Sequence, residues 1–326
     1  MPASSSEYPS DGEGESRPSS PTAEVTPAED IPGLDPSGSA RRIRRRMREI
    51  MRAQGRPFPD SPPPLPTLAE SHPLARELLA AGGEVVQEKI ASWVVKHACG
   101  TKITKFRSGG IRHAEVDAIR FVSEHTTIPV PRVLDVGEEH LTTEFIEGET
   151  LNEAWEKTLS AADRLLVARQ LRGYISQLRA IKSPDGVICS FGGRPAIDAR
   201  FRYLEGGPFA DEAAYNDFLV SDLIGDLHGD ESIRSMIRSQ MREDQEIVLT
   251  HGDLHSVNIL ARPGVGVVAI IDWELAGFYP EYLDLVRPFR PMDWDCGYYK
   301  ELLNIFPQRY DAEWVVNSVL DRWSKH

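Results

Sequence analysis

The sequence contains few of the residues that indicate a secreted or membrane protein. It has three cysteines, Cys99, Cys189 and Cys296, which are odd in number and widely separated. This argues against a disulfide framework or a zinc site and predicts reduced, mostly buried thiols. No apolar run approaches the ~20 residues that a transmembrane helix needs, and the polar N-terminal stretch lacks the apolar core of a signal peptide. We therefore expect a cytoplasmic protein without a transmembrane segment.

Basic charge is also scarce. Lys and Arg number 37 against 50 Asp and Glu, so the formal net charge is −13. This excess of acidic groups disfavours general nucleic-acid binding and is compatible with a cationic ligand. With 326 residues, 40% of them hydrophobic and 27% charged, the chain is large enough for two lobes of a globular protein.

Residues 1–40 have almost no aromatic side chains and are rich in Ser, Pro, Glu and Gly. Too little apolar surface is available to offset the chain entropy lost on folding, so we expect a disordered acidic tail. Residues 41–70 follow as a basic helix and a Pro-rich linker. Three interpretations of the arginine-rich stretch 41–52 are open: a nuclear-import signal, a contact with a membrane surface, or a solvated helix docked on the acidic body.

Residues 71–148 show the pattern of a small sheet with one main helix. A short helix is predicted at 73–81, followed by a weak strand candidate at 85–86 and clearer ones at 93–95 and 102–106. Apolar positions at helical spacing predict a helix over 112–125, and two more strands follow at 132–136 and 141–146. We expect these elements to form an N-terminal lobe.

Residues 149–326 are largely helical and predict a second lobe. Ser160 precedes a long helix whose stripe of Leu165, Ala168, Leu171, Ile175 and Leu178 should be buried. The passage 186–208 is predicted to be rich in loops. Further helices are expected around 212–227, 232–241, 298–305 and 312–323.

The most informative stretch is HGDLHSVNIL at residues 251–260, which is followed by IDWE at 271–274. Two apolar runs flank the turn RPGVG at 262–266 and predict a hairpin. That hairpin places Asn258 and Asp272 at one end, and a loop hinged at Gly252 can bring Asp253 to the same place. Such oxygen ligands suit a hard cation, Mg²⁺ first.

Four motifs carry a resemblance to a known family: TIPVP at 127–131, EFIEGETL at 144–151, HGDLHSVNIL at 251–260 and IIDWELAG at 270–277. Residues 85–310 resemble the aminoglycoside phosphotransferase and choline kinase branch of the protein-kinase-like superfamily, most closely its fungal phosphotransferase-like proteins. The resemblance implies an α+β, bilobal protein-kinase-like fold, in which a small antiparallel sheet with one main helix faces a larger, mainly helical lobe. It implies that the N-terminal lobe, residues 71–148, binds the nucleotide and that the C-terminal lobe, residues 149–326, carries the catalytic and acceptor-binding groups.

The resemblance also implies roles for single residues. Asp253 matches the catalytic aspartate that orients the acceptor hydroxyl and accepts its proton, and Asn258 and Asp272 match the two ligands of Mg²⁺. A strand lysine should bind the ATP phosphates and pair with a glutamate of the next helix. Lys105 with Glu115 fits the family's short separation better than Lys96 does, although Lys96 stays an alternative.

The adenine of ATP is expected at a hinge formed by the backbone of Glu144, Phe145 and Ile146. His251 and His255 have two interpretations, as groups that touch the active site or as packing residues.

The sequence departs from protein kinases in several places. Residues 88–95 contain no glycine, so no GxGxxG loop precedes Lys105, and Trp273-Glu274 stand where protein kinases have Phe-Gly. Few residues separate Asp272 from Pro280, which leaves no room for a long activation loop. We therefore expect an ATP- and Mg²⁺-dependent phosphotransferase acting on a hydroxyl group of a small-molecule acceptor, with cationic molecules among the candidates. The alternatives are a kinase-fold scaffold with weak or no turnover and, third, a protein kinase. The oligomeric state is left open.

Overall fold

The computed structural model describes residues 68, 72–89, 92–198, 204–221, 231–288, 297–306 and 308–324. The expected acidic tail at 1–40, the arginine-rich stretch at 41–52, the prolines at 57–66, Cys296 and part of the helix expected at 212–227 lie outside the described residues. Pro64–His326 form one compact unit. Of the two cysteines described, Cys189 is buried and Cys99 is exposed, so the expectation of mostly buried thiols holds for one of them.

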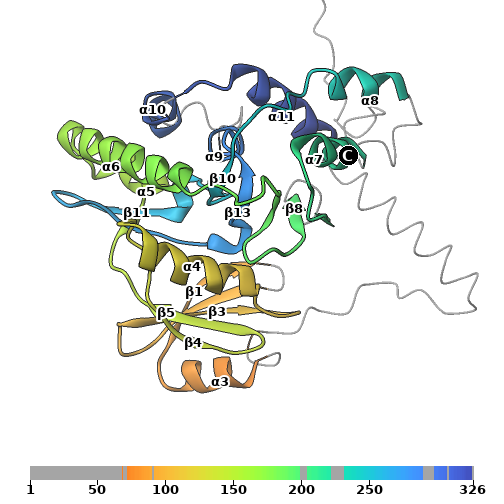
Figure 1. Ribbon diagram of the computed structural model, residues 1–326. Helices are drawn as coiled ribbons and strands as arrows, with labels where there is room; N and C mark the ends of the chain where they lie inside the picture. The colour runs from red at the N-terminus through yellow and green to blue at the C-terminus, as the bar shows by residue number, and fades with distance from the viewer. Residues whose placement is uncertain are drawn as a thin grey trace, which may run out of the picture. The chain divides into compact units, whose positions relative to one another are not determined.

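The N-terminal part of this unit is a five-stranded antiparallel sheet in the order β1-β2-β3-β5-β4 (Figure 1). Its core follows from the alternation within β2 and β3: Trp93, Val95 and Phe106 point to one face and pack with Ala75 of helix α3. Helix α4 covers the other face with its apolar stripe, so α3 and α4 lie on opposite sides of the sheet (Figure 1). The bounds are α3 Pro73–Ala80, β1 Glu84–Lys89, β2 Ser92–Lys96, β3 Lys102–Arg107, α4 His113–His125, β4 Val133–Val136 and β5 His140–Glu144.

The C-terminal part consists of helices and short strands that share one hydrophobic core. Its first elements are β6 Glu149–Thr150, α5 Leu151–Lys157, α6 Ala161–Ala180, β7 Cys189–Ser190, β8 Ala196–Asp198, β9 Leu204–Gly206, α7 Glu212–Ser221 and α8 Glu231–Arg238. The remaining ones are β10 Ile247–Thr250, η2 Ser256–Asn258, β11 Ile259–Arg262, β12 Gly266–Ile270, η3 Trp273–Leu275, β13 Gly277–Pro280, α9 Leu283–Val286, α10 Gly297–Ile305 and α11 Asp311–Ser324.

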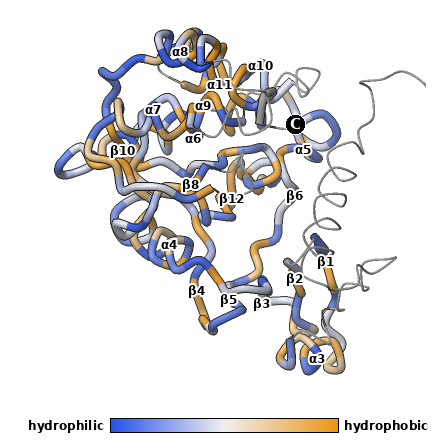
Figure 2. The backbone as a smooth tube through the Cα atoms, turned by 90° about the vertical axis from the view of Figure 1, so that its right-hand side faces the viewer, coloured by the Kyte–Doolittle hydropathy of each residue, from blue (hydrophilic) through white to orange (hydrophobic). Residues whose placement is uncertain are grey.

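Strand β10 leads into the HGD segment and is apolar over almost its whole length (Figure 2). It pairs with β13, which in turn pairs with β7. Val248 and Leu249 are fully buried, because helix α6 packs against the strand. The segment that begins at His251 therefore starts from a fixed position in the core.

The α+β, bilobal protein-kinase-like fold predicted from the sequence is confirmed by this arrangement. Helix α6 begins as predicted, because Ser160 and Asp163 form a capping box. Its buried stripe was partly wrong: Leu165 is 50% exposed, whereas Val167 is buried with the other apolar residues. The passage predicted to be loop-rich, 186–208, also contains the short strands β7, β8 and β9, which have two or three residues each and are too short to show a period in sequence.

No helix among the described residues has both the length and the apolar character needed to cross a bilayer.

Candidate active site

The segment after β10 turns sharply at Gly252, whose φ is +80°. A Cβ atom at this position would come 2.2 Å from the carbonyl oxygen of Leu275, so a side chain would require both a left-handed backbone and a shift of the neighbouring segment. Asp284 of α9 fixes the turn by accepting hydrogen bonds from the backbone N–H groups of His251 (3.0 Å) and Gly252 (2.7 Å). The turn and the helix α9 thus form one rigid support for Asp253.

Asp253 lies between two side chains that come from its own segment. Asn258 donates from Nδ2 to Oδ2 of Asp253 at 2.9 Å and also to its backbone oxygen at 2.8 Å. Nε2 of His255 lies 3.4 Å from Oδ1 of Asp253. The carboxylate is about one third exposed, so its position is fixed while an acceptor molecule can still approach it.

The two histidines differ in their surroundings. His251 is fully buried, packs 4.5 Å from the ring of Trp273, and lies with Nε2 3.0 Å from the backbone oxygen of Ile271. Its Nδ1 accepts a hydrogen bond from the N–H of Asp253 at 3.2 Å. His251 therefore matches the packing interpretation, although it also orients the segment, and His255 is the histidine beside the carboxylate.

The predicted hairpin is formed by β11 and β12, which pair Ile259 with Ile270. The N–H of Ile271 donates to the backbone oxygen of Asn258 at 2.9 Å, which brings Asn258 and the residue after Ile271 to the same end of the hairpin. That residue, Asp272, adopts the left-handed conformation with φ 64° and is the one non-glycine with positive φ among the described residues. Aspartate tolerates this conformation better than most residues do, and such outliers concentrate at functional sites.

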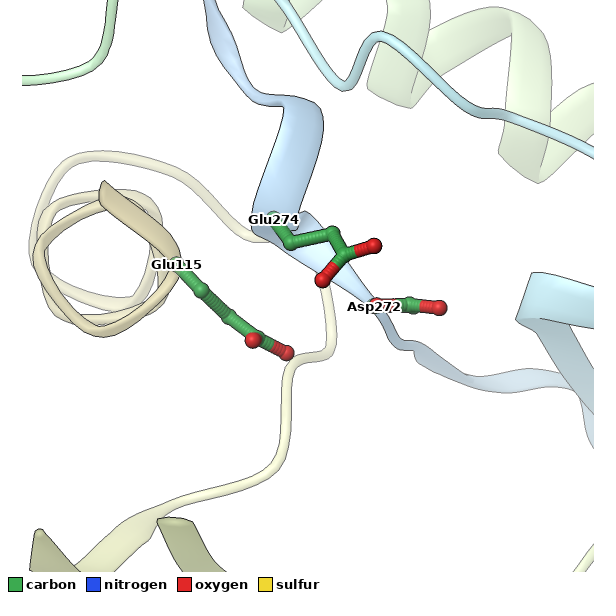
Figure 3. Close-up of side chains that lie close together, drawn as sticks. All are labelled: Glu115, Asp272 and Glu274. Atoms are coloured by element: carbon green, nitrogen blue, oxygen red, sulfur yellow. The ribbon is translucent and has the colours of Figure 1, made fainter. Parts of the chain in front are cut away.

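Lys105 of β3 connects the sheet with this end of the hairpin. Its Nζ lies 3.1 Å from both oxygens of Glu115 on α4 and 2.7 Å from Oδ1 of Asp272. A third carboxylate, Glu274 of η3, lies 3.4 Å from the same ammonium and also forms an ion pair with Arg107. Figure 3 shows Glu115 extending from α4 toward the segment that carries Asp272 and Glu274.

This concentration of charge, together with burial, shifts the pKa of Lys105, Glu115 and Asp272. Burial opposes the charge of Lys105, but Glu115, Asp272 and Glu274 outweigh it and raise the pKa of Lys105 well above its ordinary value. Burial raises the pKa of Glu115 to about 7, since Lys105 offsets the loss of solvation only in part and the two other carboxylates add to the rise. Burial also acts against the charge of Asp272, yet Lys105 holds the pKa of this carboxyl below its usual value.

A cavity of about 220 Å³ lies between the sheet and the β11–β12 hairpin. Apolar side chains such as Ile103, Leu141 and Leu260 line one part of it and charged groups line another. The structure brings seven of the eight residues proposed from the sequence to this cavity: Lys105, Glu115, Glu144, Phe145, Ile146, Asn258 and Asp272. The eighth, Asp253, contacts Asn258 at its edge.

Two of the three residues expected at the hinge have backbone N–H groups that already donate hydrogen bonds within the protein. The N–H of Glu144 bonds to the oxygen of Arg132 at 3.0 Å, and the N–H of Phe145 bonds to the oxygen of Thr101 at 2.9 Å. Lys96, the alternative to Lys105, lies elsewhere, with its Nζ 4.0 Å above the ring centre of Phe145. The spacing argument that favoured Lys105 over Lys96 therefore agrees with the geometry of the ion pairs.

Several side chains that shape the site were not identified from the sequence. Asp284 of α9 and Arg287, the residue after this helix, are 5% and 7% exposed, and Arg287 donates to the backbone oxygens of Gly252 (2.9 Å) and Ile197 (3.1 Å). No local pattern marks them, because they meet the HGD segment only through packing. Glu274 and Arg107 had a weak signal: Glu274 follows Asp272 by two residues, and Arg107 follows Lys105 by two residues on the same strand.

The described acidic residues around α7 form contacts within the protein. Asp211 caps the helix by accepting from the N–H of Ala214 at 2.8 Å, and Asp217 pairs with Arg238. Glu212 is only 5% exposed and accepts from the N–H of Gln245 at 2.9 Å. Asp222 lies outside the described residues.

The two-lobed arrangement, with a lysine–glutamate pair on the sheet side and an aspartate-bearing hairpin on the helical side, defines a protein-kinase-like fold. A family model described as "Phosphotransferase enzyme family" (APH) matches residues 84–314, which is most of the chain. The chain therefore belongs to the phosphotransferase enzyme family. No curated protein sequence gives a significant match.

Solved structures of aminoglycoside phosphotransferases share this fold. The complex of APH(2")-IIa with streptomycin and ATP superposes with a TM-score of 0.55 at 14% identity, covering 79% of this chain and 91% of that one. ADP-bound APH(2'')-Ib gives a TM-score of 0.53 at 14% identity, with 79% and 86% covered. APH(3'')-Id from Streptomyces rimosus gives 0.50 at 20% identity, with 77% and 98% covered. At these identities the similarity establishes the fold alone.

Proposed function

We propose that this protein is an ATP- and Mg²⁺-dependent phosphotransferase that transfers a phosphoryl group to a hydroxyl of a small molecule. The observation that carries the proposal is the convergence of Lys105, Glu115, Asn258 and Asp272 on one cavity, with Asp253 at its edge. Membership of the phosphotransferase family and the nucleotide-bound relatives of the same fold support it.

The donor atoms fit a magnesium ion. Asn258 uses its Nδ2 to hold Asp253, which leaves the amide Oδ1 as a ligand atom, and Asp272 contributes a carboxylate whose low pKa keeps it ionised. Two oxygen ligands suffice for Mg²⁺, which keeps waters and phosphate oxygens as its other ligands. Bound there, the ion would neutralise charge on the nucleotide phosphates.

The protein's own groups would perform the remaining steps. Lys105, held by Glu115, would contact the nucleotide phosphates, and the N–H of Ile146, which has no backbone partner among the described residues, is the hinge donor that remains for the base. Asp253 would orient the acceptor hydroxyl and accept its proton as the oxygen attacks phosphorus. Catalysis would then depend on positioning and charge neutralisation, which is typical of phosphoryl transfer.

The short segment that follows Asp272 bears on the kind of acceptor. Asp272 is followed at once by η3 and β13, so no long activation segment is inserted between Asp272 and Pro280. Protein kinases use such a segment to present a peptide, and its absence here favours a small molecule over a protein. The acidic composition of the chain is compatible with a cationic acceptor such as an aminoglycoside or an amino alcohol.

A second candidate is a nucleotide-binding scaffold without turnover. The observation that favours it is the absence of glycine between Glu88 and Val95, the region that would cover the phosphates. Measured phosphoryl transfer distinguishes the two functions, whereas ATP binding does not.

The test is ADP release by the purified full chain with ATP and Mg²⁺, using a panel of aminoglycosides, choline-like amines, amino alcohols and sugars, with Asp253→Asn as the control. We expect turnover with at least one acceptor, loss of that turnover with EDTA, and its loss in the control. If no acceptor and no basal ATP hydrolysis gave a signal above that of Asp253→Asn, the scaffold interpretation would replace the proposal.

A further inference from the structure

Arg107 links the sheet to the segment that carries Asp272. It lies two residues after Lys105 on β3, so both side chains leave the same face of the strand. Its Nη1 pairs with Oε2 of Glu274 in η3, and the two side chains are only 22% and 10% exposed. The ion pair thus joins β3 to η3 at a partly buried position, where water screens the charges less than at the surface.

Glu274 is shared between two cations. The same Oε2 that pairs with Arg107 lies 3.4 Å from Nζ of Lys105. Lys105 in turn lies 3.1 Å from Glu115 and 2.7 Å from Asp272. The cluster therefore holds three carboxylates (Figure 3) and two cations, and Lys105 contacts all three carboxylates.

Binding of the nucleotide phosphates would change which cation neutralises each carboxylate of the cluster. In the proposed function, Asp272 would be neutralised by the magnesium ion, and Glu115 would keep its bidentate contact with Lys105. Glu274 would compete with the phosphates for the same ammonium unless another cation compensated it. Arg107 is already in place for that task.

We propose that Arg107 is a positioning residue that neutralises Glu274 and thereby leaves Lys105 available to the nucleotide phosphates. This inference rests on the proposed function, because it concerns nucleotide binding at the same cavity. Without Arg107, Glu274 would draw Lys105 away and would leave a carboxylate charge beside the phosphates. Like charges in such proximity weaken binding.

The test is a double-mutant cycle on ATP binding in the presence of Mg²⁺, measured by calorimetry on the full chain. We expect Arg107→Gln to raise the ATP Kd by roughly 10-fold, because one charge–charge contact in a partly buried site is worth about that much. At saturating ATP, kcat should change by less than about 3-fold, since Arg107 acts on binding rather than on the transfer step. Arg107→Lys, which keeps the charge, should bind ATP nearly as well as wild type.

The diagnostic variant is Arg107→Gln combined with Glu274→Gln. Removal of the carboxylate removes the need for its partner, so the double variant should recover an ATP Kd within about 3-fold of wild type. If the ion pair only held β3 and η3 together, removal of both charges would not restore ATP binding. The matched control is Arg194→Gln, which breaks the more exposed ion pair with Asp117 of α4 and should leave the ATP Kd unchanged.

Two results would overturn the role of Arg107: an unchanged Kd in Arg107→Gln, or a double variant that binds ATP as weakly as the single one. If the wild type binds ATP but transfers no phosphoryl group to any acceptor, the proposed turnover fails while the binding cycle still decides the role of Arg107. If the wild type binds no ATP, both proposals fall.

Discussion

The buried carboxyl of Glu212 makes the stability of the protein depend on pH in a direction that can be calculated. Glu212 is 5% exposed, its Oε2 accepts the N–H of Gln245, and its Oε1 has no partner among the described residues. Burial raises the pKa of Glu212 from 4.5 to about 7, partly offset by the Gln245 N–H and reinforced by Asp244, Glu313 and Glu243. The folded protein therefore binds a proton at this site more tightly than the unfolded chain does.

The sign follows from that difference. Stability from the protonated carboxyl is fully present below pH 4.5, the ordinary value, and is lost as the pH rises through about 7. A rise of this size corresponds to about 3 kcal/mol, and solvent screening of the exposed carboxylates of Asp244 and Glu243 reduces the expected loss to about 2 kcal/mol. Glu212→Gln keeps an acceptor for Gln245 but cannot ionise, so this loss should disappear.

The assay is guanidinium unfolding of the full chain and of Glu212→Gln at pH 5, 6, 7 and 8. The free energy of unfolding of the variant relative to wild type should increase by about 2 kcal/mol between pH 5 and pH 8, because all other groups titrate alike in both proteins. Glu231→Gln is the control, since Glu231 is 80% exposed and should give a difference that does not vary with pH. A pH-independent difference for Glu212→Gln would refute the reasoning.

Three further predictions concern the proposed active site. Asp253→Asn should lower kcat by at least about 100-fold, the usual contribution of a general base. The ATP Kd measured by calorimetry should stay within about 3-fold of wild type, because Asp253 lies outside the cavity. Equal losses in kcat and in ATP affinity would argue for a structural role. Lys105→Met should weaken ATP binding by about 10-fold or more, since it removes a charged contact with the phosphates, whereas Lys96→Met should not weaken it. If Lys96→Met weakened ATP binding in the same titration and Lys105→Met did not, Lys96 would be the residue that contacts the phosphates. Asp284→Asn should lower the free energy of unfolding by about 2 kcal/mol, because a buried carboxylate that accepts two backbone N–H groups is lost. The same variant should lower kcat more than it raises the KM for ATP. An unchanged free energy of unfolding in guanidinium would show that the two hydrogen bonds to His251 and Gly252 contribute little.

The local features of this protein were readable in the sequence because each depends on neighbours along the chain. The turn RPGVG between two apolar runs predicts the β11–β12 hairpin, and Ser160 predicts the start of α6. The pairing of Lys105 with Glu115, ten residues apart, was predicted through the resemblance to the family, because its usual separation fits this pair.

The elements that sequence reasoning missed are those without a local period. Strands β7, β8 and β9 have two or three residues each. They form because β7 pairs with β13 and β8 pairs with β9. Leu165 fits the helical stripe of α6 as well as Val167 does, and only the packing of α6 against β10 and β12 decides that Val167 is buried and Leu165 exposed. A hydrophobic period gives the direction of a face to within a residue or so, and contact with other elements settles the rest.

For the candidate site, the sequence by itself determined the chemical groups: a carboxylate and an amide at one end of a hairpin, and a lysine and a glutamate in a separate lobe. Only the tertiary structure decided how their charges are balanced. Glu274 meets Lys105 and Arg107 across 169 and 167 residues of chain, and Asp284 meets Gly252 across 32. The energy of such contacts depends on distance and burial, which arise when the two lobes pack together and which no spacing along the chain specifies.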